Sequence, residues 1–347
     1  MAYTTINNGS LFMNTKLYTG NGSTNAITGV GFQPDFTWLK NRSVSQNHEL
    51  YDAVRGVTKA INSNTTSAET TYTNGLNAFG TDGFTVGDSA YINGNGNGIA
   101  SWNWLANGSG SANTDGDIAS TVSANTTSGF SIVSYTGNAT AGATVGHGLG
   151  VVPKMIIIKI RSGVGGVQWV VYHVSTGNTK ACYLNTTTAP VTVTGFFNNT
   201  TPSSTVFTLG TDTAVNSSGN PMIAYCFADV QGYSKFGSYV GNSSTDGTFV
   251  YTGFKPAFVI IKETGTGTQD WYMNTGKING YNVQDDYLAP NTSASEVVGG
   301  GLKLDMLSNG FKLRANAQGV NTGYTYIYMA FAEAPLVGTN NIPANAR

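Results

Sequence analysis

Charged residues are scarce in this chain of 347 amino acids. Asp, Glu, Lys and Arg make up 10% of it and the formal net charge is -1, whereas an average soluble domain is roughly 25% charged. No cluster of Lys and Arg is present that could neutralise phosphates, so the composition excludes a nucleic-acid-binding protein. Thr, Asn, Ser and Gly supply the polarity instead, which suits β-rich proteins that work outside the cytoplasm or within a large assembly.

Cysteine and histidine are also rare. Two cysteines, Cys182 and Cys226, are too few for a disulfide framework, and we expect free thiols that pack as small core residues rather than a disulfide. The three histidines, His48, His147 and His173, have no His, Cys or carboxylate at metal-ligand spacing. The sequence therefore predicts no bound metal, no cofactor and no catalytic residue.

Long apolar runs and an export signal are missing too. No stretch approaches the roughly 18 consecutive apolar residues of a membrane-spanning helix, so we expect no membrane span. Residues 1–10 lack the basic head and apolar core of a secretory signal. Such a composition without a signal is expected of a viral particle protein, made in the host cytoplasm and released by lysis. A mature secreted protein shown without its signal would look the same.

What the chain does contain is a ten-residue phrase that occurs three times. Each copy has Gly, Pro, a large apolar residue and Lys at the same offsets, and the copies are Gly31–Lys40, Gly150–Lys159 and Gly253–Lys262. The prolines, at positions 34, 153 and 256, lie 119 and 103 residues apart. Solenoid repeats have periods of roughly 20 to 50 residues, so this spacing predicts repeated domains.

Three further landmarks recur in the same order around each copy. A Tyr-x-Gly-Asn motif precedes the phrase, a strand-like phrase follows it, and an alternating aromatic or apolar pair closes the unit. These landmarks are Tyr18–Asn21, Tyr135–Asn138 and Tyr239–Asn242; Gly83–Val86, Val206–Leu209 and Gly310–Leu313; and Trp102 with Trp104, Tyr225 with Phe227 and Met329 with Phe331. Four landmarks at near-constant spacing indicate a triplication.

The local pattern predicts an all-β fold of three tandem antiparallel β-sandwich or jelly-roll-like domains related by this internal repeat. Phe36, Trp38 and Lys40 fall on one face of a strand. Residues 155–160 are apolar on both faces except at Lys159, which indicates a strand covered on both sides. Asn-Gly and Asp-Gly pairs between the runs favour tight hairpins. Only residues 48–54 have the apolar spacing of a short helix.

The landmarks also set the expected domain boundaries. We expect unit 1 at residues 1–108, a flexible glycine-rich linker at 109–117, unit 2 at 118–232 and unit 3 at 233–347. The short connection between units 2 and 3 contains aromatic residues, which predicts a stiff pair with unit 1 hinged to it. The polar C-terminal tail, 338–347, is expected either to be loose or to clip onto a neighbour.

Few side chains are candidates for chemistry. The best cluster, His48, Glu49, Asp52 and Arg55, is interpreted as a surface turn with an Asp–Arg pair rather than a catalytic group. His147 lies between glycines in a loop, where it could bind a ligand but more commonly caps backbone groups. The glycine-rich run Asn93–Gly98 reads as a flexible hairpin tip. The acidic pairs have turn-like contexts rather than positions facing a cleft, and they are Asp115 with Asp117 and Asp285 with Asp286.

Two repeated features carry both a structural and a functional interpretation. Lys40, Lys159 and Lys262 are the charged residues shared by all three units. They are expected to cover a sheet edge, and the alternative is contact with a carboxylate of a neighbouring subunit. The tryptophans are expected in the core, and the alternative is an exposed platform for sugars; they are Trp38, Trp102, Trp104, Trp169 and Trp271.

Several longer phrases resemble a repeated domain in virion proteins of tailed phages, particularly phages of marine bacteria. The phrases are Gly31–Arg42, Leu50–Gly56, Asp82–Gly87, Gly129–Asn138, Gly146–Gly150 and Gly232–Ser238. The resemblance runs from about residue 12 to 335. It implies a particle protein, often a tail fibre or appendage, and it brings no known catalytic residues.

Together these patterns favour a non-enzymatic virion structural protein. Long fibres have an anchoring segment and a shaft, whereas this chain begins at its first β domain and ends just after its third. We therefore expect an exterior capsid decoration or a short tail appendage that docks on other virion proteins as a homo-oligomer. The alternative is an adhesin that binds host-surface polysaccharide, strengthened by multivalency. A polysaccharide depolymerase is disfavoured because no pair of acids stands out.

Overall fold

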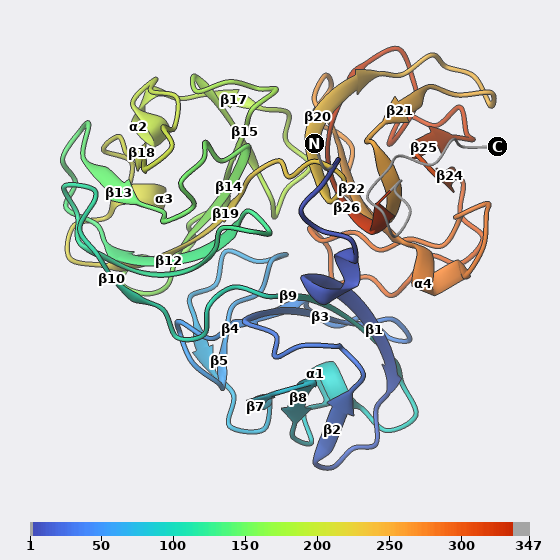
Figure 1. The fold of residues 1–347 in the computed structure, drawn as a ribbon, viewed down its shortest axis with the longest axis horizontal. Coiled ribbons are helices and arrows are strands. Elements are labelled where there is room, and N and C mark those ends of the chain that lie inside the picture. Colours follow the sequence, from blue (N-terminus) through green and yellow to red (C-terminus); the bar gives the residue numbers. More distant parts are fainter. Residues whose placement is uncertain (1–2, 336–347) are drawn as a thin grey trace.

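The computed structural model describes residues 3–335, which form seven β-sheets with antiparallel strand pairing and five short helices. Three lobes lie around a common centre, and the chain passes through them in sequence order (Figure 1). The prediction of an all-β fold is confirmed. The C-terminal tail at 338–347 lies outside the described residues.

The helices and strands divide among the three units as follows. Unit 1 contains η1 (Gly9–Leu11), β1 (Met13–Thr19), β2 (Asn25–Thr28), β3 (Phe36–Asn41), β4 (Glu49–Asp52), β5 (Lys59–Ala60), β6 (Thr70–Thr71), β7 (Leu76–Gly80), β8 (Gly83–Val86), α1 (Ala90–Asn93) and β9 (Gly98–Trp104). β10 (Ser111–Asn113) follows, and unit 2 contains β11 (Ser120–Asn125), β12 (Phe130–Thr136), β13 (Thr144–Gly146), β14 (Met155–Ile160), β15 (Val170–His173), β16 (Lys180–Tyr183), β17 (Val191–Thr192), α2 (Thr194–Phe197), β18 (Val206–Thr208), α3 (Thr213–Asn216) and β19 (Pro221–Phe227). Unit 3 contains β20 (Ser234–Val240), β21 (Phe249–Tyr251), β22 (Phe254–Glu263), β23 (Trp271–Thr275), α4 (Gly276–Asn279), β24 (Leu304–Leu307), β25 (Gly310–Leu313) and β26 (Thr325–Pro335).

One four-stranded arrangement occurs three times. The strand orders are β1-β9-β3-β4, β12-β19-β14-β15 and β20-β26-β22-β23, and in unit 2 the sheet continues on both edges to eight strands. The residue pairing is equivalent as well: β3 pairs Phe36 with Trp104, β14 pairs Met155 with Phe227, and β22 pairs Phe258 with Phe331. The repeat found in the sequence therefore aligns strand for strand in the structure.

The repeat strands are buried on both faces, and in β3 and β14 the two faces belong to different cores. In β14, Met155 and Ile157 pack into the cluster at the centre of the molecule. Ile156 and Ile158 pack on the other side, against Phe207 of the small sheet formed by β13 and β18. The prediction of a strand covered on both sides is confirmed.

The Tyr-x-Gly-Asn landmark ties the first strand of each four-stranded arrangement (β1, β12 or β20) to the short segment before β9, β19 or β26. The tyrosine hydroxyl donates to a backbone carbonyl, at 2.6 Å in all three units. The backbone N–H of the motif asparagine donates to the side-chain oxygen of a second asparagine, which directly follows the residue that carries this carbonyl. The pairs are Tyr18 to Ile92 and Asn21 to Asn93, Tyr135 to Val215 and Asn138 to Asn216, and Tyr239 to Val320 and Asn242 to Asn321. Asn93 is fully buried in this role, so the start of the Asn93–Gly98 run is a fixed structural element. The prediction of a flexible tip is wrong there.

Three equivalent aromatic rings meet at the centre of the molecule. Trp104, Phe227 and Phe331 occupy the same position in β9, β19 and β26, and their ring centroids lie 5.8–6.3 Å apart. Phe36 also stacks on Tyr225 of unit 2 at 4.3 Å. The three units therefore share one core, arranged as a pseudo-threefold ring.

This shared core overturns the expected hinge. Unit 1 contacts both other units, so the prediction that it is hinged to a stiff pair is wrong. Within the expected linker at 109–117, residues 111–113 form β10 and pair with β11, because a neighbouring strand can supply backbone partners whatever the composition. The expected boundaries are not tested by the topology and stay predictions.

The expected short helix at 48–54 is also wrong. Residues 49–52 form β4, which pairs with β3, and Leu50 bridges to Ile61 on its other side. Apolar spacing over seven residues cannot separate a short helix from a strand, and here the available strand partners decide the outcome.

Candidate functional site

Buried polar side chains lie at each of the three junctions between neighbouring units. Each repeat lysine donates to two backbone carbonyls, one in its own unit and one in the preceding unit of the ring. The contacts are Lys40 Nζ to Gln46 O and to Ser293 O (2.8 Å), Lys159 Nζ to Val167 O (2.6 Å) and Thr66 O (3.0 Å), and Lys262 Nζ to Gln269 O (2.7 Å) and Thr187 O (2.8 Å). Three equivalent lysines thus close a ring of three equivalent junctions.

The buried position of these lysines corrects their interpretation. All three are fully buried, so they do not cover a sheet edge, and their acceptors are carbonyls of the same chain rather than carboxylates of another subunit. Burial lowers the pKa of Lys40 and of Lys159 to about 8, and it lowers the pKa of Lys262 as well. The sequence identified the right residues but not their partners.

A second ring of contacts uses the residue just before β4 and β15 and the first residue of β23. A ring nitrogen of His48, Trp169 or Trp271 donates to a backbone carbonyl of the neighbouring unit, across the junction. The contacts are His48 Nε2 to Ala289 O (3.1 Å), Trp169 Nε1 to Asn62 O (2.9 Å) and Trp271 Nε1 to Tyr183 O (3.0 Å). His48 carries its proton on Nε2, because Nδ1 accepts from Trp38 Nε1 at 2.9 Å.

Three asparagines hold these donors in place, and our reading of the sequence missed them. Asn64, Asn185 and Asn291 each accept the backbone N–H of His48, Trp169 or Trp271 at 3.0 Å. The sequence contained two signals of this role. Each asparagine is followed by two hydroxyl residues, in Asn-Thr-Thr twice and Asn-Thr-Ser once. The three asparagines also lie at similar distances after the repeat prolines, at 30, 32 and 35 positions (64 − 34, 185 − 153, 291 − 256). Because Asn and Thr are abundant throughout the chain, these triplets did not stand out.

Replacing Asn185 with alanine should lower the free energy of unfolding by about 1–2 kcal/mol, because it leaves the Trp169 N–H without its acceptor. Urea denaturation monitored by circular dichroism measures the change. Thr188→Ala is the matched control, since Thr188 is exposed in the same loop, and surface changes of this kind stay within about 0.5 kcal/mol. Equal effects of the two substitutions would contradict the role given to Asn185.

Ion pairs reinforce two of the three junctions. Arg42 forms a bidentate pair with Glu296 at 2.6 and 2.8 Å, and Arg161 forms one with Glu69 at 2.9 and 3.1 Å. At the junction of units 3 and 2, the same offsets from the lysine and the asparagine are occupied by Thr264 and Pro190. The pair expected to be stiffest, units 2 and 3, therefore lacks an ion pair that both junctions of unit 1 possess.

Of the cluster predicted as a surface turn, Asp52 and Arg55 form a buried network between units 1 and 2, whereas His48 contacts unit 3 and Glu49 accepts from Tyr51 of its own strand. Arg55 Nε lies 2.5 Å from Asp52 Oδ2, and the Tyr225 hydroxyl donates to the same oxygen at 2.8 Å. Both charged side chains are completely buried. Burial works against the charge of Arg55, but Asp52 and the other neighbours outweigh it and raise the pKa of the guanidinium. The Asp–Arg pair is confirmed and the surface position is wrong.

A model of one protein family matches residues 8–335 of the chain, and its description is domain of unknown function DUF7483. The chain belongs to the DUF7483 family. No curated protein and no solved structure matches it. The match covers all three four-stranded arrangements, so a DUF7483 domain comprises the whole pseudo-threefold ring and not one third of it.

The histidine, cysteine and tryptophan candidates that remain in this DUF7483 chain all have structural roles. His147 caps its loop as predicted, accepting from Leu149 N at Nδ1 and lying 3.2 Å from Ser203 O at Nε2. The cysteines are free and buried, as predicted, and burial raises the pKa of each thiol to about 12. All five tryptophans are buried, so the core interpretation is confirmed for them.

The four acidic residues accept hydrogen bonds within turns and loops. The contacts are Asn113 Nδ2 to Asp115, Thr144 N to Asp117, Asn279 Nδ2 to Asp285 and Gly299 N to Asp286. Within residues 3–335, no group of three or more His, Cys, Asp and Glu side chains is placed to hold a metal ion. The part of the chain that the structure describes also contains no helix long and apolar enough to cross a bilayer.

Glu49 is the carboxylate with the most perturbed surroundings in the cluster. Burial raises its pKa to about 7, and the Tyr51 hydroxyl donates to Oε2 at 2.6 Å. A perturbed carboxylate is a usual candidate for catalysis. Glu49, however, is fully buried within strand β4, so a substrate has no access to it in this conformation.

His173 links units 2 and 3 and gives a pH-dependent prediction. Nδ1 accepts from Ser175 N, Nε2 donates to Tyr328 O at 3.1 Å, and burial lowers the pKa of the imidazole to about 4. The unfolded chain binds a proton near pH 6.5, so stability is fully present above that pH and is lost as pH falls toward 4. By pH 5 the loss should be about 2 kcal/mol relative to pH 7.5.

Comparison with His173→Gln isolates this effect, because glutamine can retain both hydrogen bonds but does not titrate. Glu49 works in the opposite direction over a similar pH range, since its raised pKa favours folding at lower pH; it cancels because it is present in both proteins. Urea unfolding of both proteins at pH 7.5 and 5 provides the measurement. A stability difference that is independent of pH would contradict the assignment.

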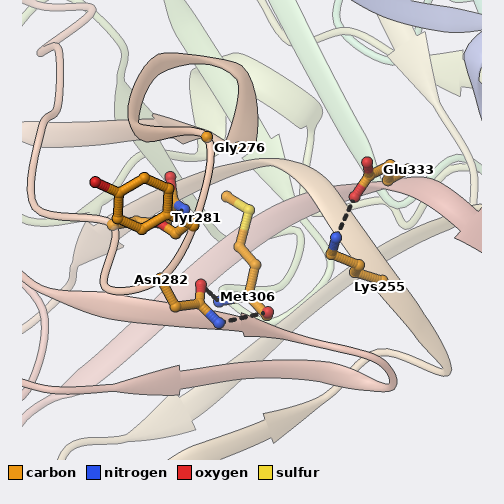
Figure 2. A pocket seen from close by; sticks show the side chains of 8 residues that line it. Lys255, Gly276, Tyr281, Asn282, Met306 and Glu333 are labelled. Atoms are coloured by element: carbon orange, nitrogen blue, oxygen red, sulfur yellow. Dashed lines mark hydrogen bonds and ion pairs between the residues drawn. The ribbon is translucent and has the colours of Figure 1, made fainter.

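Several pockets open on the surface of unit 3, and two of them combine aromatic and charged side chains. One, of about 520 Å³, lies where the N-terminal segment meets the unit, and its lining includes Tyr3, Asp229, Lys235 and Tyr251. The other, of about 290 Å³, lies beside α4 and is lined by Tyr281, Gln284, Lys255 and Glu333 among others (Figure 2). Both present polar side chains to solvent, in contrast to the junctions, where the polar groups are enclosed.

Proposed function

We propose that this chain is a non-enzymatic structural protein of a bacteriophage virion, either an exterior capsid decoration or a short tail appendage. Its three tandem units would be β-sandwiches of jelly-roll type related by triplication. The protein docks on other virion proteins and is present in many copies on the particle exterior, with contacts between copies set by the particle's symmetry.

The closed ring of junctions is the observation that supports this proposal best. The shared charged residues, Lys40, Lys159 and Lys262, all bind backbone carbonyls between units. The buried charges of Asp52 and Arg55 also lie between units. In the described part of the chain, these buried polar and charged side chains hold the three units together. A component of a particle requires such rigidity.

The ring also suggests how the protein would dock. A chain with three equivalent units presents similar structural elements three times around one axis, and so does a trimer of a particle protein. One copy of this chain would therefore sit on each threefold or local threefold position, contacting three equivalent surfaces of the partner.

Electron microscopy of purified particles tests the proposal, with a label fused to the C terminus of the chain. Label spread over the shell, one copy for each threefold position, would establish a capsid decoration. Label confined to the tail would establish an appendage. Particles that carry no label, from infected cells that do contain the labelled protein, would overturn the virion role.

A second candidate function, adhesion to host-surface glycans, is favoured by one specific observation. Tyr281 is 81% exposed at the edge of the pocket beside α4. A flat, exposed ring beside polar groups is a common way for proteins to contact sugars. This candidate is compatible with a position on the particle exterior.

A further inference from the structure

The pocket beside α4 is formed by a segment that is longer in unit 3 than in the other two units. Asp52 and Asn64 are 12 positions apart (64 − 52), as are His173 and Asn185 (185 − 173), and these residues occupy equivalent positions. In unit 3 the equivalent distance, from Thr275 to Asn291, is 16 positions (291 − 275). The four additional residues belong to the stretch that contains α4 and Tyr281, so the repeat departs from its pattern at the pocket.

The pocket has an aromatic side and a polar side. Figure 2 shows the ring of Tyr281 on one side and the ion pair of Lys255 with Glu333 on the other, with Met306 and Asn282 between them. Tyr281 is the most exposed of the large apolar or aromatic side chains that the structure describes, at 81%. Its ring can therefore pack against a ligand without displacing any part of the core.

One polar atom in the wall of the pocket lacks a partner. Gln284 lines the pocket and is 2% exposed, its Nε2 donates to Tyr281 O at 2.8 Å, and its Oε1 accepts no hydrogen bond from the described residues. A buried amide oxygen is normally paired, because leaving it without a donor is unfavourable. The missing group is a hydrogen-bond donor, and a hydroxyl of a ligand in the pocket would supply it.

The ion pair at the mouth determines the charge of the ligand. Lys255 Nζ and Glu333 Oε2 lie 2.7 Å apart and both side chains are about half exposed, at 49% and 50%. The ammonium can donate to a ligand oxygen and the carboxylate can accept from a hydroxyl. Because the two charges balance, the site favours an uncharged ligand over an anion or a cation.

We propose that this pocket binds one uncharged pyranose ring of a saccharide. The apolar C–H face of the ring packs on Tyr281, whose π face carries partial negative charge. Its hydroxyls bond to Gln284, Lys255 and Glu333. The cavity of about 290 Å³ is at the lower limit of small-ligand pockets, which start at roughly 300 Å³, so it accommodates a single ring. This assignment gives the glycan-binding candidate a defined site and is independent of where the protein is located.

Saturation-transfer-difference NMR on the full-length protein tests the site, with D-glucose, D-galactose, D-mannose, L-rhamnose and N-acetyl-D-glucosamine as separate probes at millimolar concentration. At least one sugar should receive saturation from the protein, and Tyr281→Ala should weaken that binding about tenfold, roughly the loss of one stacking contact. Tyr281 is exposed, so the variant is expected to fold normally, and an unchanged melting temperature verifies this.

Tyr251→Ala is the matched control. Tyr251 is also an exposed tyrosine of unit 3, at 59%, but it lines the other pocket. Binding that survives Tyr281→Ala, or that is lost only in Tyr251→Ala, would overturn the assignment, as would the absence of transfer to all five sugars. The ligand could be a free sugar or a sugar unit of a surface polysaccharide, and a polymer of the sugar that binds distinguishes the two. Tighter binding of the polymer indicates a surface polysaccharide. Equal binding per sugar residue indicates a free sugar.

Discussion

Replacing Trp104 with alanine should lower the free energy of unfolding by about 3–5 kcal/mol, the usual cost of removing a large buried ring. Trp104 is 1% exposed, and its ring lies 5.7–6.3 Å from Phe258 and Phe331 of unit 3 and Phe227 of unit 2. The cavity would open where all three units meet, so no single unit can close it. Differential scanning calorimetry should show one transition at a clearly lower temperature.

Trp104→Phe is the matched control, because Phe227 and Phe331 occupy the equivalent positions in the other two units. It retains a ring at the centre and removes a buried indole N–H that has no partner among the described residues. The cost should stay below about 1.5 kcal/mol, as for swaps that retain most of the packing. If Trp104→Ala instead shifted only one of several separate transitions, the three units would not share a core.

Replacing Arg55 with methionine should cost a comparable amount, about 3–5 kcal/mol. The substitution leaves the carboxylate of Asp52 buried with only the Tyr225 hydroxyl and the Arg55 backbone N–H as donors, and breaking a buried ion pair by removing one partner is strongly destabilising. Methionine retains most of the side-chain volume, so the loss reflects charge rather than a cavity. Urea unfolding at pH 7 provides the measurement.

The double variant Asp52→Asn with Arg55→Met separates this explanation from simple loss of packing. With both charges removed, no unpaired charge remains in the core, and the double variant should be more stable than Arg55→Met alone. Each single change and the pair form a thermodynamic cycle whose coupling energy measures the interaction. A coupling energy near zero would mean that Arg55 acts only through its bulk.

The sequence was sufficient to predict features that depend on nearby residues. The repeat glycines illustrate this: Gly31, Gly150 and Gly253 all adopt positive φ, at 94°, 72° and 85°, which explains why glycine recurs there. The alternation around Phe36 and Met155 also predicted correctly which side chains share a face. In these cases the conformation is dictated within a few residues of the motif.

Features that depend on distant residues could not be read in the same way. Lys40 donates to Ser293, 253 positions away, and a lysine at the end of an apolar strand looks identical whether it faces solvent or another unit. Arg55 and Asp52 were paired correctly from their spacing, but their burial comes from Tyr225 in the next unit. The hinge was predicted from the glycine-rich composition of the connection at 109–117. The position of unit 1 is instead fixed by core residues such as Trp104, which lie outside that connection.

The encoding of all three units in one polypeptide has a consequence for how the protein can change. In a homotrimer every substitution appears at three places, so a new loop must be tolerated by all three junctions at once. Here one junction can differ from the other two. Thr264 and Pro190 occupy the positions at which the other junctions have arginine and glutamate. The longer segment around Tyr281 is such a change: one unit can acquire a specialised surface while the other two preserve the ring.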